Sequence, residues 1–344
     1  MRVVDLFSGC GGMSLGFADA GFNVTAAFDN WLPAIEVYKN NFDHPIHQQD
    51  LSNVSESIKL ISSYSPQMLI GGPPCQDFSS AGKRDVTLGR ADLTTNFSEI
   101  VNQLKPNWFV MENVEQIKKS DILREVIEEL KGEYGLTTVI LNAALCGAPQ
   151  SRTRFFLVGN KGGEHNELAP VFQRNLAPSM MTVRDYFGDK LGTEYYYRHP
   201  RNYSRRGVYG LDEPSATIRG VNRPIPGGYS FNKNDPKDIT MDAVRQLTTD
   251  ERAQIQTFPA SFKWLGSKTN REQMIGNAVP VALGSFVGKC ILDFISNGSE
   301  PTTELFAYDD VVIAVGGRND YGYSDSDVVD TGVLLQRLED VIVL

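Results

Sequence analysis

The stretch that decides the fold reads "VVDLFSGCGGMSLGFADAGF" and spans residues 3 to 22. A short apolar run typical of a β-strand, residues 3–7, leads into a glycine cluster and then into a segment that we expect to be helical. Gly9, Gly11 and Gly12 allow the backbone to turn sharply between strand and helix. The N-terminus of a helix in such a place attracts a carboxylate or a phosphate. The turn is thus a candidate ligand site, but the glycine spacing differs from the G-x-G-x-x-G pattern of dinucleotide enzymes, and an ordinary strand-to-helix turn stays open as the alternative.

The first half of the chain repeats this alternation. Short apolar segments rich in strand-forming residues occur at 3–7, 23–28, 68–72, 108–113, 137–143 and 154–160, and segments such as SDILREVIEELK at 120–131 have helical character. Strands that alternate with helices predict an α/β fold, with a mostly parallel sheet and helices on both of its faces. Because ligands of such sheets bind beyond the carboxyl ends of the strands, we expect functional side chains just after the apolar segments.

The composition is that of a globular chain. With 344 residues and 41% hydrophobic content it can bury a large core, and we expect one large and one smaller lobe. The four cysteines are far apart and match neither a zinc site nor a disulfide framework, which favours a reducing, cytoplasmic setting. Asp5 and the glycines interrupt the apolar N-terminus, which argues against a signal peptide. No run reaches the roughly 18 uninterrupted apolar residues of a membrane helix, so we expect no membrane partner.

The net charge of −9 is unevenly distributed. Residues 297–344 hold ten acidic and two basic residues, a net of −8, which leaves −1 for residues 1–296. Within residues 198–223, six arginines face only two acidic residues. The acidity therefore belongs to a C-terminal extension, and the chain carries a local basic patch that suits an anionic partner.

Two acidic residues are candidates for nucleoside binding. Asp29 ends the second apolar segment, where its carboxylate can accept hydrogen bonds from ribose hydroxyls. Asp50, in HQQDLS, is the second candidate. Helix caps and turns place Asp at such positions just as readily, so that alternative stays open.

The stretch "GGPPCQDFS", residues 71–79, places a cysteine directly after an apolar segment and two prolines. Pro73 and Pro74 fix two φ angles and remove two backbone donors, so the segment is stiff and cannot continue a sheet. Most lone cysteines are buried and inert. A cysteine that only packs in the core would not need a loop held rigid by two prolines, as this one is. We therefore interpret Cys75 as a nucleophile at the ligand edge of the sheet.

Acidic and basic partners for this thiol follow two other apolar segments. The segment at 108–113 ends in Glu112 and Asn113, and QSRTRFF at 150–156 carries Arg152 and Arg154 on one side by two-residue periodicity. Each of these residues taken alone could equally be a salt-bridge partner.

In this order, DLFSGCGG, GGPPCQDFS, ENV, QSRTR, RQLTTDERAQIQTFP and QMIGNAVP resemble the motifs of the DNA cytosine C5-methyltransferases found in bacterial restriction-modification systems. The resemblance implies a Rossmann-like, S-adenosylmethionine-dependent methyltransferase domain with a smaller inserted target-recognition domain. It implies a catalytic domain at 1–170 and 244–296, a target-recognition domain at 171–243, and an acidic extension at 297–344 that no motif covers. The catalytic residues that match are Cys75, Glu112, Arg152 and Arg154. The cofactor residues that match are Phe7, Gly9, Gly11, Gly12, Asp29, Asn30, Asp50, Asn277 and Val279.

The chemistry suits these residue types. Cytosine C5 is a weak nucleophile, and addition of the Cys75 thiolate to C6 would activate it. Protonated Glu112 would donate to N3, and Arg154, with Arg152 behind it, would stabilise charge near O2 or hold Glu112. The resemblance implies no metal.

A cytosine stacked in a duplex must be flipped out before a thiolate can reach its ring. The expected partner is double-stranded DNA, and arginines of the basic patch would contact phosphates or guanine. The residues predicted to contact DNA are Gln76, Ser79, Arg90, Arg198, Arg201, Arg205, Arg206, Thr217, Arg219 and Arg223.

Three other functions stay open: an RNA (tRNA) cytosine-5 methyltransferase, a non-catalytic nucleic-acid-binding relative, and a nicotinamide oxidoreductase. The last explains the glycines but gives Cys75, Glu112 and the arginines no task. We expect a monomer associated with DNA in the cytoplasm, together with a cognate restriction endonuclease that acts on the same site without direct contact.

Overall fold

The structure, a computed structural model, describes residues 1–74, 93–202, 204–237, 239–298 and 312–313. All of them fall within one compact unit, Met1–Ala314. Cys75, Gln76, Ser79 and Arg90 lie outside the described residues, as does nearly all of the predicted acidic extension.

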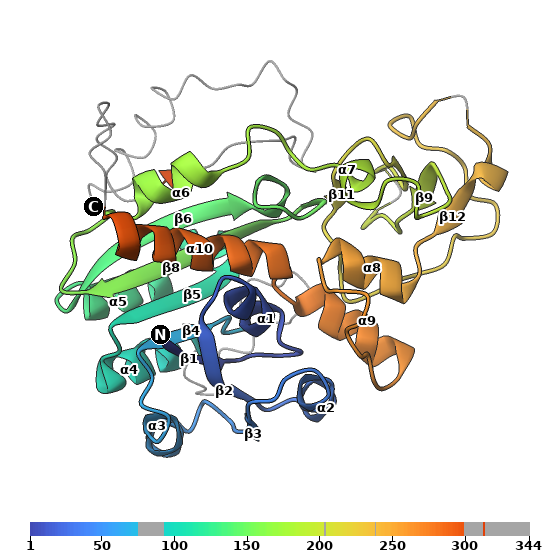
Figure 1. The fold of residues 1–344 in the computed structure, drawn as a ribbon. Helices are drawn as coiled ribbons and strands as arrows, with labels where there is room; N and C mark the ends of the chain where they lie inside the picture. Colours follow the sequence, from blue (N-terminus) through green and yellow to red (C-terminus); the bar gives the residue numbers. More distant parts are fainter. Residues whose placement is uncertain (75–92, 203, 238, 299–311, 314–344) are drawn as a thin grey trace. The chain divides into compact units, whose positions relative to one another are not determined.

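A large sheet forms the centre of the unit (Figure 1). Among the described residues it has eight strands in the order β13-β6-β8-β5-β4-β1-β2-β3. The neighbouring pairs are parallel except at β8, which runs antiparallel to both β5 and β6. The strands are β1 (Arg2–Leu6), β2 (Asn23–Asp29), β3 (Ile46–Gln48), β4 (Met68–Gly71), β5 (Trp108–Val114), β6 (Tyr134–Asn142), β8 (Thr153–Lys161) and β13 (Val312–Ile313). This confirms the predicted α/β fold with a mostly parallel sheet.

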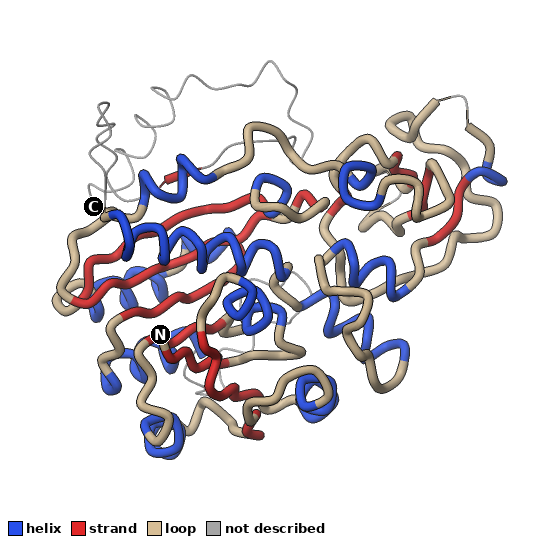
Figure 2. The backbone as a smooth tube through the Cα atoms, in the orientation of Figure 1, coloured by secondary structure: helices blue, strands red, loops and turns tan. Residues whose placement is uncertain are grey.

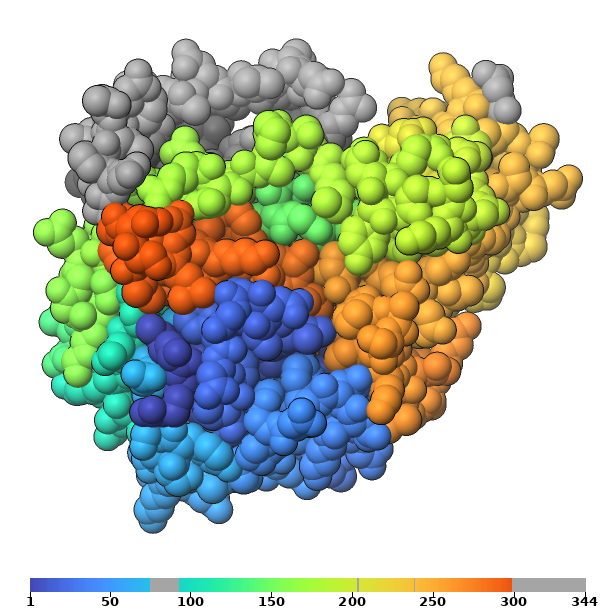
Figure 3. Space-filling model, in the orientation of Figure 1, coloured from blue at the N-terminus to red at the C-terminus, as the bar shows by residue number. Residues whose placement is uncertain are grey.

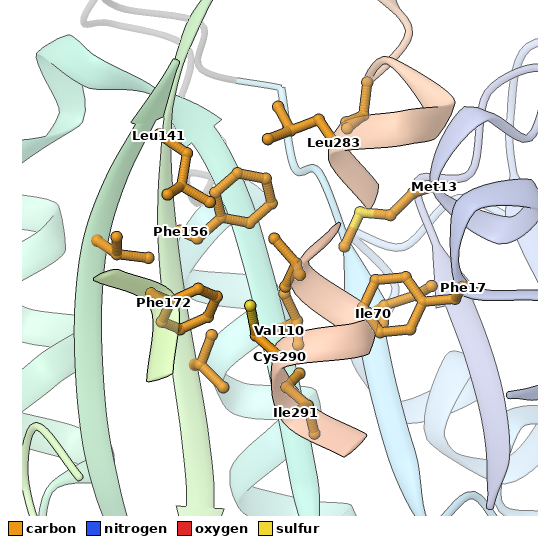
Figure 4. Close-up of a cluster of buried hydrophobic side chains, with 14 of the residues drawn as sticks. Met13, Phe17, Ile70, Val110, Leu141, Phe156, Phe172, Leu283, Cys290 and Ile291 are labelled. Carbon is orange, nitrogen blue, oxygen red and sulfur yellow. The ribbon is translucent and has the colours of Figure 1, made fainter. Parts of the chain in front are cut away.

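Helices cover both faces of the sheet (Figure 2). On one face, α1 (Gly12–Asp19), α6 (Ala169–Asn175) and α10 (Val281–Asn297) contribute to an apolar core with β1, β4 and β5. Figure 4 shows this core, where Met13 and Phe17 of α1 and Leu283, Cys290 and Ile291 of α10 gather over Ile70 and Val110. On the other face, α3 (Val54–Ser62), α4 (Leu93–Leu104) and α5 (Asp121–Leu130) bury Ile61, Phe97, Ile100, Leu123 and Val126.

The helix predicted at 120–131 shows why the sequence folds locally as it does. Ser120 caps α5, because its hydroxyl accepts a hydrogen bond from the Leu123 backbone N–H group at 3.2 Å. Leu123, Val126 and Leu130 then recur at helical spacing and are buried. The apolar stripe therefore faces the sheet, and the charged residues face solvent.

Each predicted apolar segment forms a strand of this sheet, whereas β3 was missed. It has three residues, and two of them, His47 and Gln48, are polar, so no apolar run signals it. Its pairing partner β2 holds it in the sheet through parallel contacts of Ala27, Phe28 and Asp29.

A second, smaller sheet lies after residue 190, with described strand order β10-β9-β12. Its strands are β9 (Tyr195–Tyr197), β10 (Val208–Gly210) and β12 (Val244–Gln246), and α7 (Val183–Phe187) precedes it. The buried Asp235 carboxylate fastens the sheet: it accepts the N–H groups of Gly207 and Val208, each at 2.9 Å, and the Tyr229 hydroxyl at 2.7 Å. A further short strand, β11 (Ser215–Ala216), pairs with β7 (Gln150–Ser151), and this pairing links the region to the start of β8.

The chain then returns to the first strands through α8 (Thr249–Ile255), α9 (Lys268–Asn277) and α10. Figure 3 shows the returning residues, in orange, against the N-terminal residues, in blue. By length and composition the stretch Lys268–Asn297 could cross a membrane, but 56% of its most apolar window is buried. Because α10 packs on α1 and α6, we read it as a core helix.

Candidate functional site

The turn after β1 is held closed by Asp29 at the end of β2. Its Oδ2 atom accepts the Gly9 N–H group at 2.7 Å, and its Oδ1 atom accepts the Trp31 N–H group at 2.8 Å. Burial raises the pKa of Asp29, against the lowering effect of these hydrogen bonds. A carboxylate offers about four acceptor positions, so Asp29 keeps capacity for a further donor such as a hydroxyl group.

The backbone of the turn needs its glycines. Gly9 and Gly11 have φ of 54° and 97°, in the left-handed region. Phe7 has φ of 58° without being glycine, a costly conformation that tends to occur at functional sites.

The returning segment packs directly on this turn. A Cβ atom on Gly12 would lie 2.4 Å from the Val279 carbonyl oxygen, and one on Gly16 would lie 2.5 Å from that of Val281. The Cys10 thiol faces the Met274 carbonyl oxygen at 3.9 Å. Gly12 and Val279 are therefore neighbours, although some 270 positions separate them in the sequence.

Three of the four remaining predicted cofactor residues lie on the surface. Asn30, Asp50 and Asn277 are exposed, and Val279 is buried. Asp50 accepts the Ser52 N–H group at 3.0 Å, in the manner of a turn residue. Their roles stay predictions.

Sequence reasoning missed a buried polar chain beneath the turn. The Tyr38 hydroxyl donates to Ser14 Oγ at 2.7 Å, and Ser14 donates to Asp5 Oδ2 at 2.5 Å. Burial raises the pKa of Asp5 to about 7. Asp5 and Ser14 lie within the quoted stretch, but neither spacing nor composition distinguishes them from ordinary strand and helix residues.

The segment ahead of Cys75 lies against the end of β5. A Cβ atom on Gly72 would be 3.0 Å from Glu112 Oε2, and Asn113 Nδ2 donates to the Pro73 carbonyl oxygen at 3.1 Å. The glycine explains how the chain passes so close to the carboxylate. Cys75 lies outside the described residues, but Gly72 and Pro73 ahead of it are fixed beside Glu112 and Asn113.

Glu112 and Arg154 form a largely buried ion pair, with 2.8 Å between Arg154 Nε and Glu112 Oε1. Burial raises the pKa of Glu112, and the Arg154 and Arg152 guanidinium groups only partly offset this effect. The carboxyl group is therefore more easily protonated than an exposed glutamate. Of the two predicted tasks of Arg154, the geometry favours holding Glu112.

Arg152 is placed differently from Arg154. Only 2% exposed, it donates to the carbonyl oxygens of Ile218 at 3.1 Å, Gly276 at 3.0 Å and Ala278 at 3.1 Å. Its catalytic role stays a prediction, and its contacts are those of a residue that ties three chain segments together.

The three described cysteines are poor nucleophile candidates. Cys10, Cys146 and Cys290 are buried. Burial raises the pKa of the Cys10 and Cys290 thiols to about 12 and that of Cys146 well above its ordinary value. Since the thiolate is the reactive form, these cysteines are inert near neutral pH.

Some arginines of the basic patch form hydrogen bonds or ion pairs within the protein, and others are exposed. Arg198 donates to the Thr217 carbonyl oxygen at 2.9 Å, Arg219 donates to the His199 carbonyl oxygen, and Arg206 pairs with Glu213. These three arginines support the fold of the region. Two others, Arg201 and Arg223, are exposed, and Arg205 is half-buried.

Behind the patch lies a buried ion pair that the sequence did not signal. Arg252 Nε lies 3.1 Å from Glu272 Oε2, and both side chains are at most 7% exposed. Arg252 also donates to the carbonyl oxygens of Arg219 and Val221. The pair therefore clamps the backbone that carries Arg219 and Arg223.

Among the described residues, no group of three His, Cys, Asp or Glu side chains is arranged to hold a metal ion.

Comparison with known proteins shows the family of the chain. Residues 1–293 match the family described as C-5 cytosine-specific DNA methylase. The chain is 61% identical over 295 residues to the type II methyltransferase M.HindV of Haemophilus influenzae, covering 86% of this chain and 97% of that protein. It is 52% identical over 297 residues to the type II methyltransferase M.HgiDI of Herpetosiphon aurantiacus, covering 86% and 96%.

Solved structures share the fold at lower identity. A Dnmt2 methyltransferase of S. pombe aligns with a TM-score of 0.64 at 22% identity, covering 86% of this chain and 99% of that one. A prophage-encoded E. coli protein, described as a putative DNA modification methyltransferase, aligns with a TM-score of 0.62 at 22% identity, covering 86% and 100%.

Proposed function

The chain belongs to the C-5 cytosine-specific DNA methylases, and from this premise we propose that it methylates C5 of a flipped-out cytosine through a covalent bond between Cys75 and C6. It is a DNA (cytosine-5-)-methyltransferase of the restriction-modification type. The observation that carries the proposed mechanism is the convergence of the Gly72–Pro73 segment, Glu112 and Arg154 at the carboxyl ends of β4 and β5.

The turn after β1 fits S-adenosylmethionine. It combines hydrogen-bond donors, the backbone N–H groups at the start of α1, which suit a carboxylate, with an acceptor, the Asp29 carboxylate, which suits ribose hydroxyls. Bound there, S-adenosylmethionine supplies an electrophilic methyl group. Phe7, Gly9, Gly11, Gly12 and Val279 would line its site, with Asn30, Asp50 and Asn277 at its exposed margin.

The residues of the β4–β5 edge then act on the base. The Cys75 thiolate forms a bond to C6, and Glu112 gives a proton to N3, so that C5 becomes nucleophilic. After C5 has gained its methyl group, a base removes the C5 proton, the Cys75–C6 bond breaks, and N3 returns its proton to Glu112, which regenerates the thiolate and the catalytic acid. Arg154 keeps the Glu112 carboxyl in place throughout.

DNA approaches from the side of the basic patch. Arg201 and Arg223 are exposed there, and they would meet phosphates. Gln76, Ser79 and Arg90 follow Cys75 in the sequence, and they would contact the flipped nucleotide or its vacated place.

Asp29→Ala should weaken S-adenosylmethionine binding by about 1–3 kcal/mol, through lost hydrogen bonds and a loosened Gly9 turn. Isothermal calorimetry measures this change, with Asp43→Ala as an exposed control. Unchanged cofactor affinity in a folded Asp29→Ala protein would remove Asp29 from the site.

Replacing Arg201 and Arg223 together with alanine should weaken DNA binding. The plot of log K against log salt concentration should become less steep by the amount expected for the loss of about two phosphate contacts. The matched control is Lys118→Ala with Arg124→Ala, two surface cations at and near the start of α5. Fluorescence anisotropy at several salt concentrations gives the slope, and an unaltered slope would mean that DNA lies elsewhere.

The proposed substrate is duplex DNA rather than tRNA, because relatives at 52–61% identity are type II methyltransferases. Bisulfite sequencing of a plasmid from cells that express the protein tests activity, base and site together. Methyl incorporation into tRNA but not into duplex DNA would replace the proposal with the RNA alternative. We further propose a cytoplasmic, DNA-associated monomer that acts alongside a cognate endonuclease.

A further inference from the structure

The five residues Gln150–Arg154 run between the proposed catalytic pair and the basic patch. Side chains at alternate positions of an extended chain share one side, which groups Gln150, Arg152 and Arg154. Arg154 holds Glu112, whereas the other two side chains reach Ile218. One short segment thus contacts both the catalytic carboxyl and the loop that carries the patch.

Both backbone polar groups of Ile218 form hydrogen bonds with side chains of this segment. Its N–H group donates to Gln150 Oε1 at 2.8 Å, and its carbonyl oxygen accepts from Arg152 at 3.1 Å. Next to it, the Thr217 hydroxyl donates to the Ser151 carbonyl oxygen at 2.9 Å. The backbone ahead of Arg219 is therefore fixed to the start of β8.

Gln150 is itself held by a second amide. Its Nε2 atom donates to Gln256 Oε1 at 2.6 Å, and both side chains are fully buried. Gln256 in turn donates to the carbonyl oxygens of Ile275 at 2.5 Å and Ala278 at 3.0 Å. The amide pair therefore joins the Ile218 loop to the break between α9 and α10.

That break contains Val279, whose carbonyl oxygen faces Gly12. The Gln150–Gln256 pair thus lies where three parts of the proposed machinery meet: the Glu112–Arg154 pair, the arginine-bearing loop and the segment against the cofactor turn. Nothing in the catalytic chemistry requires these two amides.

We propose that Gln150 and Gln256 are positioning residues that fix the Ile218–Arg223 loop relative to Glu112, so that contact with the target sequence aligns the cytosine for attack. This inference rests on the proposed function. Two buried amides suit such a task because they hold a peptide at fixed distance and angle, and removal of either one leaves the other unsatisfied. A displacement of about 1 Å at a reacting centre can cost on the order of 100-fold in rate.

The test replaces Gln150 with methionine, which keeps the length of the side chain and removes its hydrogen bonds. We expect kcat on the cognate duplex to fall about 10- to 100-fold, with S-adenosylmethionine affinity unchanged. The ratio of kcat/KM between the cognate duplex and duplexes with one substituted base pair should fall as well. Gln103→Met, an exposed position on α4, is the matched control and should behave as the wild type.

Gln256→Met and the double variant show whether the two amides act together. The losses of kcat in the two single variants should not add in the double variant, because each single change already breaks the Gln150–Gln256 hydrogen bond. Gln150→Glu keeps an acceptor for the Ile218 N–H group and should show an intermediate loss. It also serves as the test variant if Gln150→Met does not fold.

The inference is overturned if folded Gln150 variants keep wild-type kcat and discrimination. It is equally overturned if kcat falls only in proportion to the folded fraction and cofactor affinity falls with it, since that pattern marks a purely structural role. Failure of the wild-type protein to methylate duplex DNA would instead overturn the proposed function.

Discussion

A Cys75→Ser variant is expected to lose methyl transfer to duplex DNA by at least about 1000-fold while it still binds S-adenosylmethionine. Serine has the right shape, but its hydroxyl stays protonated near neutral pH and lacks the nucleophilicity of a thiolate. The proposed cofactor turn lies on other strands, so its affinity should be preserved. Methyl incorporation from labelled cofactor and calorimetry measure the two quantities.

Duplex DNA with 5-fluorocytosine at the target position makes the same prediction visible as a covalent adduct. After methyl transfer, C5 bears fluorine where a proton must depart, and fluorine cannot leave as a cation. A complex that survives denaturing electrophoresis should form only with S-adenosylmethionine, and it should be absent in Cys75→Ser and Cys75→Ala.

The other cysteines provide the controls for this experiment. Cys10, Cys146 and Cys290 are buried with raised thiol pKa values, so alanine at each position should leave the adduct intact. An adduct at one of these cysteines, or one that persists without Cys75, would refute the proposed nucleophile.

Glu112→Gln is expected to lower kcat by about 100- to 10,000-fold, because the amide cannot give up a proton to N3. Burial raises the pKa of Glu112, so the wild-type carboxyl group keeps its proton to higher pH than an exposed glutamate. Wild-type kcat should therefore fall as pH rises through this raised pKa, and the residual activity of Glu112→Gln should lack that fall. Rates measured across a pH series test both statements.

Glu115→Gln is the matched control, since Glu115 lies three residues further on and pairs with Lys118 at the surface. It should leave both kcat and its pH dependence unchanged. A Glu112→Gln enzyme with wild-type kcat would show that N3 is protonated by another group. If Glu112→Gln does not fold, the cause would be Arg154, whose buried guanidinium group would have lost its carboxylate partner.

The sequence predicted six strands of the sheet because each of them is a short, mostly apolar segment, and these segments alternate with helical ones. β3 escaped because its pairing with β2, rather than its own composition, makes it a strand. Glu112 and Arg154 were both named from the sequence, but their pairing depends on the antiparallel register of β5 and β8, which no local pattern specifies.

For the arginines of the basic patch, the sequence did not reveal which side chains make contacts within the protein. Six arginines close together predicted six contacts with DNA, and these roles stay predictions. The sequence did not show that Arg198 and Arg219 donate to carbonyl oxygens and that Arg206 pairs with Glu213. The Gln150–Gln256 pair was equally hidden, because residues 106 positions apart meet only in the folded chain.

The close packing of Gly12 on Val279 bears on how the protein is made. The N-terminal strands leave the ribosome early, whereas α10, which covers Met13 and Phe17, is synthesised more than 250 residues later. Contacts of such long sequence separation form late, after a large cost in chain entropy. A nascent chain should therefore expose the apolar face of α1 until residue 297 has emerged, and methyltransferase activity should appear only at that point of translation.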